Sequence, residues 1–93
     1  MKEFDAEVMI FHNSTTIQSN YQAVMHSGNI RQTIKALNIE TVNNQNFLRL
    51  GDKGLIKFRF QSYPEMLKEG SNLIFREGKT IGIGHVAKVY PLK

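Results

Sequence analysis

The feature that most constrains this chain is a two-residue alternation of apolar and polar side chains that recurs between short turn signals. Over residues 4–11 apolar side chains occupy every second position. The pattern is equally clear over residues 55–60, where Ile56, Phe58 and Phe60 alternate with basic side chains. Successive side chains of a β-strand point to opposite faces, so this period is typical of strands with one buried face. We therefore expect these aromatic and aliphatic side chains inside and the basic ones outside.

Turn-forming residues separate the other strand candidates. The remaining expected strands are residues 21–26, 30–39, 72–76 and 80–90. The 30–39 segment is ambiguous, because Ile30, Ile34 and Leu37 also fit helical spacing. We interpret it as a strand, since its neighbours are strands and no helix cap is convincing. With residues 48–52, which end in a Gly-Asp turn signal, the chain offers six or seven short strands.

A chain of 93 residues has room for one core, so we expect a single domain over residues 1–93. A lone open sheet of short strands would expose two unpaired edges, and closure into a barrel or sandwich removes them. Gly82 and Gly84 lie on alternate positions of the last expected strand. A glycine there allows a tight bend or the close approach of another backbone, so we assign both to barrel packing.

The sequence lacks the residues of most catalytic and metal sites. It has no cysteine, which excludes a disulfide framework, a thiolate metal site and a cysteine nucleophile. His12, His26 and His85 are too far apart for a zinc-binding motif. Residues 14–16 are hydroxylic, but nothing resembles GxSxG, and we interpret them as a turn. The phosphate-binding pattern GxxxxGK[ST] is also absent, so we expect no enzyme activity from this chain.

Charge favours a polyanionic partner. Twelve Lys and Arg against eight Asp and Glu give a net charge of +4. The aromatic residues Tyr21, Tyr63 and Phe75 lie among these cations, as in surfaces that bind nucleic acid. A barrel with a charged exterior and no ligand explains the same pattern. No apolar run is long enough to span a membrane, and a cytoplasmic location fits. The cations expected at strand exteriors or turns are Arg31, Arg49, Lys53, Lys57, Arg59, Arg76 and Lys79.

Several stretches resemble a known family. Residues 4–8 (FDAEV), 50–52 (LGD) and 75–84 (FREGKTIGIG), followed by 86–89 (VAKV), are similar to domain III, the C-terminal barrel of elongation factor Tu and its relatives. The FREGKTIGIG stretch is the most specific part. Within the family, the segments that point to the GTP-binding protein 1 and 2 branch of elongation-factor-like translational GTPases are 28–33 (GNIRQT), 48–53 (LRLGDK) and 58–60 (FRF).

The resemblance implies a six-stranded antiparallel Greek-key barrel that is the C-terminal domain of a larger GTPase. GTP and Mg would then be bound by a separate P-loop domain, with no cofactor in this chain. Its partners would be the GTPase domain and the middle barrel of the same parent protein. Aminoacyl-tRNA or another RNA, and the ribosome, are further implied partners.

The resemblance also implies an RNA-contacting turn. Its Gly78 N–H beside the Lys79 side chain can approach a sugar-phosphate backbone, and Glu77 can accept from a 2′-OH group. A single Lys79 stands where the bacterial factor has Gly-Arg, which leaves the tRNA geometry open. Alternatively, the turn serves only the hairpin, and the barrel is a protein-interaction or structural module. The candidate RNA-binding residues are Arg76, Glu77, Gly78, Lys79, Arg31 and Gln22.

Overall fold

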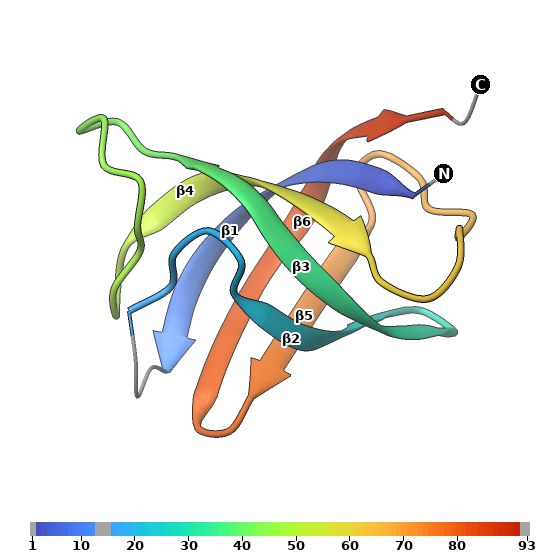
Figure 1. The fold of residues 1–93 in the computed structure, drawn as a ribbon, viewed down its shortest axis with the longest axis horizontal. Helices are drawn as coiled ribbons and strands as arrows, with labels where there is room; N and C mark the ends of the chain where they lie inside the picture. Colours follow the sequence, from blue (N-terminus) through green and yellow to red (C-terminus); the bar gives the residue numbers. More distant parts are fainter. Residues whose placement is uncertain (1, 13–15, 92–93) are drawn as a thin grey trace.

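A computed structural model describes residues 2–12 and 16–91 of the chain. Within these residues, six strands pair antiparallel into one closed barrel, in the order β1-β4-β3-β2-β5-β6 (Figure 1). Strands β2, β3 and β4 are neighbours in chain order, and β1 lies beside β4 instead of β2. This is a Greek-key arrangement. The all-β fold and the barrel are therefore confirmed. The strands are β1 Glu3–His12, β2 Gln22–Ser27, β3 Ile30–Glu40, β4 Lys53–Phe60, β5 Asn72–Glu77 and β6 Thr80–Tyr90.

The ambiguous 30–39 segment is a strand, because the barrel pairs both of its edges. Strand β3 hydrogen-bonds to β2 on one side and β4 on the other. A register shift between Ala36 and Asn38 changes the alternation, so that Ile39 again faces the core. Residues 48–52 form no strand; Leu48 makes only an isolated bridge to Ile17. The turn predicted at residues 14–16 lies mostly outside the described residues.

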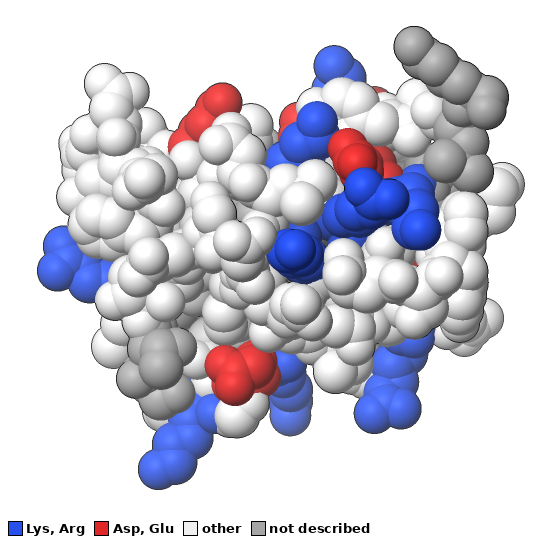
Figure 2. Space-filling model, viewed as in Figure 1, with Lys and Arg blue, Asp and Glu red and all other residues white. Residues whose placement is uncertain are grey.

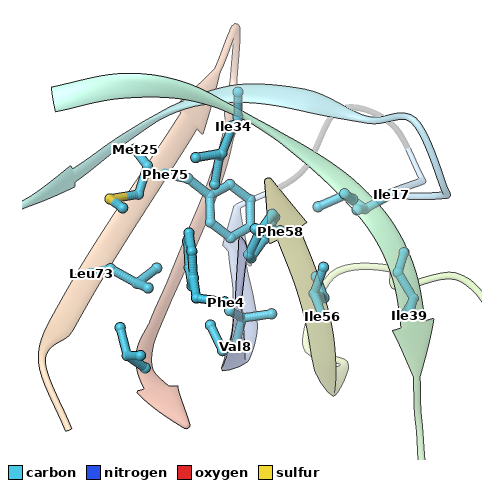
Figure 3. Close-up of a cluster of buried hydrophobic side chains, with 14 of the residues drawn as sticks. Phe4, Val8, Ile17, Met25, Ile34, Ile39, Ile56, Phe58, Leu73 and Phe75 are labelled. Carbon is cyan, nitrogen blue, oxygen red and sulfur yellow. The ribbon is translucent and has the colours of Figure 1, made fainter. Parts of the chain in front are cut away.

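Four phenylalanines form the centre of the core. Phe4 of β1 lies 5.6 Å from Phe58 and 5.1 Å from Phe60 between ring centroids. Phe75 of β5 meets Phe58 edge-on at 5.7 Å (Figure 3). Tilted and edge-on rings at these separations attract beyond the area they bury. The expectation that Phe75 belongs to a surface aromatic set was wrong: it shares the inward phase of β5 with Leu73 and is fully buried.

Two glycines let the strands approach closely. A Cβ added at Gly84 would overlap the main-chain carbonyl of Glu7 on β1, and one at Gly82 would overlap the ring of Phe75. The first overlap involves backbone, so it could be relieved only by moving a strand. The assignment of both glycines to barrel packing is confirmed. Within the described ranges, no helix is long and apolar enough to cross a bilayer.

Replacing Phe58 with alanine should destabilise the barrel by about 3–5 kcal/mol, because it leaves a cavity among the core rings. The free energy of unfolding, measured in urea, checks this. The matched control is Phe11→Ala, which removes the same atoms from a side chain that is 63% exposed. It should cost about 0.5 kcal/mol or less. Equal losses for the two variants would contradict the assignment of the core.

Candidate nucleic-acid interface

The β5–β6 hairpin carries four of the six candidate residues. Glu77 and Thr80 are register partners, so Gly78 and Lys79 form a two-residue turn between them. Gly78 has a φ of +58°, and glycine is preferred at the first central position of a type II′ hairpin. Arg76 and all three residues that follow it are exposed. The hairpin projects from the end of the barrel opposite both chain termini (Figure 1).

The tip of the hairpin is fastened to the end of β1. The imidazole Nδ1 of His12 donates to the main-chain carbonyl of Lys79, with 2.7 Å between the two atoms. Below the turn, Thr80 is fully buried. These two attachments hold the backbone in place while the Lys79 side chain stays exposed to solvent. The hairpin is therefore a positioned cationic turn.

Tyr21 lies beneath this hairpin and is only partly buried. Its ring meets Phe75 edge-on, with 6.1 Å between centroids, so it packs against the core. Burial is the main cause that raises the pKa of Tyr21 to about 12. The Glu77 carboxylate adds to the rise, and the Thr80 side chain opposes it. The Tyr21 hydroxyl is therefore protonated at neutral pH, and its ring packs beneath the hairpin. The interaction of Tyr21 with Glu77 could not be predicted from the sequence, because the two residues are far apart along the chain.

The barrel brings only one of the two remaining candidates to the hairpin. Val24 is the register partner of Arg76, and Gln22 lies two residues before Val24 on the same outward face. Gln22 and Arg76 are therefore diagonal neighbours, about 7–8 Å apart between Cα atoms. Arg31 pairs instead with His26, toward the other end of the β2–β3 ladder. Arg31 is exposed but lies apart from the hairpin.

Sequence reasoning missed Gln32, a buried amide that fixes the connection after β4. Its Oε1 accepts from the main-chain N–H of Ser62 at 2.7 Å and of Tyr63 at 3.1 Å. Its Nε2 donates to the Tyr63 carbonyl and the Glu65 carboxylate. Gln32 occupies the same alternating positions in the sequence as the apolar residues Ile34 and Ala36, which predicts that it points inward. A buried amide needs hydrogen-bond partners, so this pattern could have identified it. The result is an exposed Tyr63 on a fixed backbone.

A second surface lies away from the hairpin. An open groove of about 970 Å³ crosses β3, β4, β1, β6 and β5. Its apolar lining includes Met9, Leu55 and Ile83. Glu7 and His85 also line it, with 2.8 Å between the Glu7 carboxylate and Nε2 of His85. An apolar centre with charged groups around it is typical of a surface that docks another protein.

Comparison with known proteins identifies relatives over nearly the whole chain. A family model described as the elongation factor Tu C-terminal domain matches residues 1–90. GTP-binding protein 2 of Homo sapiens is 43% identical over 86 residues, which cover 92% of this chain and 14% of that protein. GTP-binding protein 1 of Xenopus laevis is 42% identical over 87 residues, covering 94% and 13%. This chain therefore spans a small part of the relatives that it matches.

The fold also matches a solved structure. The crystal structure of sup35 complexed with GDP superposes with a TM-score of 0.83, at 18% identity, over 98% of this chain and 26% of that one. At this identity the likeness concerns the fold alone. It supports the closed barrel independently of the sequence comparison.

Replacing Tyr21 with phenylalanine should reduce the fall in the free energy of unfolding that occurs as the pH rises above 10.0. The folded-state pKa of about 12 exceeds the ordinary value of 10.0, so the folded chain holds this proton more tightly than the unfolded chain. The resulting stabilisation is fully present below pH 10.0 and is lost as the pH rises to about 12. Urea unfolding across this interval should show a steeper decline for the wild type than for Tyr21→Phe. Tyr63→Phe, at an exposed position, is the matched control. Parallel declines in wild type and Tyr21→Phe would contradict this role.

Proposed function

This chain belongs to the elongation factor Tu C-terminal domain family, and we propose that it serves as the C-terminal barrel of an elongation-factor-like translational GTPase. Residues 1–93 would then be one module of a longer cytoplasmic protein. A separate domain would bind GTP and Mg and hydrolyse the nucleotide, and this barrel would be non-catalytic. The family match over residues 1–90 is the observation that carries the proposal.

We further propose that the barrel docks on the GTPase domain and the middle barrel of its parent protein through the apolar groove. Met9, Leu55 and Ile83 offer an apolar centre, and Glu40 and Lys53 lie at charged positions along the same groove. Burying apolar side chains of this kind supplies most of the affinity of stable protein interfaces. The lining of the groove includes none of residues 76–80, so docking there leaves the hairpin turn available.

The proposed second role is contact with RNA through the hairpin. Exposed Arg76 and Lys79 would face phosphates, Gly78 would allow close approach of the backbone, and Glu77 would accept from a 2′-OH group. Gln22 supports the same contact, because it is a diagonal neighbour of Arg76. The proposed ligands are the stem of aminoacyl-tRNA or another RNA helix, with the ribosome as a further partner. Arg31, at the other end of the β2–β3 ladder, would contact a separate part of the helix.

A barrel that only binds proteins is the second candidate function. The apolar groove favours this candidate, because an apolar surface suits a protein partner and gives no contact for a phosphate backbone. The two candidates differ in one observable, which is whether the hairpin cations contribute to RNA affinity.

The double variant Arg31→Glu, Lys79→Glu tests the RNA role. It should weaken binding of a tRNA to this chain and reduce the slope of log K against log salt by about 1–2, since phosphate contacts are lost. Fluorescence anisotropy at several low salt concentrations measures both quantities. Lys53→Glu, Lys68→Glu changes the charge equally at two exposed positions away from the hairpin and should keep the slope. An unchanged slope in the Arg31→Glu, Lys79→Glu variant favours the barrel that only binds proteins.

The variant Ile83→Glu tests the docking role. It places a charge in the groove and should weaken binding to the GTPase and middle domains of a family member by tenfold or more, about 1.4 kcal/mol. Isothermal titration calorimetry measures the affinity. Met66→Glu is the matched control, because Met66 is 92% exposed on the connection between β4 and β5. If both variants bind as the wild type does, the groove is not the docking surface.

A further inference from the structure

Strands β3 and β4 place two cations directly opposite each other on the outside of the barrel. Lys35 and Arg59 are register partners, and both belong to the outward phase of their strands. Directly opposed side chains have Cβ atoms about 4.5–5.5 Å apart, and like charges in that position destabilise a sheet. The fold therefore tolerates electrostatic repulsion between Lys35 and Arg59, which a neutral residue at either position would remove.

The neighbouring Glu3 carboxylate pairs with Arg59 but not with Lys35. Within the described part of the chain, the side chain of Lys35 forms neither a hydrogen bond nor an ion pair. Arg59 is the register partner of Glu3 on β1 and reaches its carboxylate at 3.7 Å, and Lys57 shares that carboxylate at 3.5 Å. Lys57 also lies over the ring of Tyr90, 4.6 Å from its centroid. Lys35 is therefore open to an external anion, and Arg59, which shares one carboxylate with Lys57, can add a second contact to it.

The pair continues a polar row that begins at the hairpin surface. Gln22 of β2 is the register partner of Lys35, so Gln22, Lys35 and Arg59 lie side by side across three strands. Figure 2 shows Lys and Arg side chains gathered over β3 and β4 on this face. None of the large exposed apolar side chains in the described ranges belongs to the row. Gln22, in this row, is two residues before Val24 along β2, and Val24 is the register partner of Arg76. The row is therefore about 7 Å along the strand direction from the pair of Val24 and Arg76.

We propose that Lys35 and Arg59 together bind one backbone phosphate of a double-stranded RNA stem that also contacts the β5–β6 hairpin. The proposal rests on the RNA role proposed above and extends its surface by two residues. A phosphodiester carries one negative charge over two free oxygens, so each cation can take one oxygen. The phosphate then relieves the repulsion between the two cations. A protein partner is less well matched, because the row has no apolar centre.

Salt-dependent binding of a short RNA hairpin to this chain tests the shared phosphate. The variants are Lys35→Gln, Arg59→Gln and the double variant, and amide chemical shifts at low salt report binding even when it is weak. The double variant should lower the slope of log K against log salt by about 0.9, which corresponds to one phosphate. Lys53→Gln, an exposed cation on the same strand β4, should keep the slope. Lys35→Gln alone should unfold at an equal or higher urea concentration than the wild type.

Each other outcome overturns the proposal in a distinguishable way. A slope reduced by about 1.8 would mean two separate phosphates and no shared one. If Lys79→Glu weakens binding but the double variant does not, the hairpin contact stands and the shared phosphate is wrong. If RNA moves no amide shift in the wild type, both are wrong. If polyglutamate moves the shifts of Lys35 and Arg59 as RNA does, the row binds acidic protein.

Discussion

Strand β1 hydrogen-bonds to β4 along one edge and to β6 along the other, and closure of the barrel depends on these two pairings. Without them the remaining strands form an open sheet with two unpaired edges. The closure needs Gly84, because any side chain there would overlap the backbone of β1. It also brings Phe4 against the aromatic core. Both proposed binding surfaces depend on β1, since His12 at its end fastens the hairpin and Met9 lines the groove.

The barrel divides its outer surface between two kinds of chemistry. The face of β2, β3 and β4 presents Gln22, Lys35 and Arg59 in one polar row, with the cationic hairpin beside it. The groove, which is lined by residues of β1, β3, β4, β5 and β6, presents apolar side chains such as Ile83. Because each strand of a closed barrel turns one of its two side-chain rows outward, the identity of the outward residues alone decides which face suits which partner.

The sequence predicted most of the features that depend on which side chains of a strand face inward, and the placement of Phe75 is the exception. Alternation alone assigned Phe58 to the core and Arg59 to the surface, and the position of Gly84 indicated close packing. Features that depend on register were not predictable. The pairing of Lys35 with Arg59 follows a strand alignment that alternation does not fix. The separation of Arg31 from Gln22 has the same origin.

The remaining differences come from contacts between distant segments. Gln32 forms its hydrogen bonds with the connection after β4, about thirty positions along the chain, and only the folded barrel brings them together. Phe75 was placed on the surface because of its basic neighbours in sequence, whereas its strand phase turns it inward. Proximity along the chain was a poor guide in both cases.

The most direct test of the division between the two surfaces is an amide chemical-shift map of the chain with each partner in turn. With an RNA stem, the shifts should be confined to the hairpin, to Arg31 and to the row of Gln22, Lys35 and Arg59. With the GTPase and middle domains of a family member, they should be confined to the residues that line the apolar groove, such as Met9, Leu55 and Ile83. Shifts on the same residues with both partners would contradict the division.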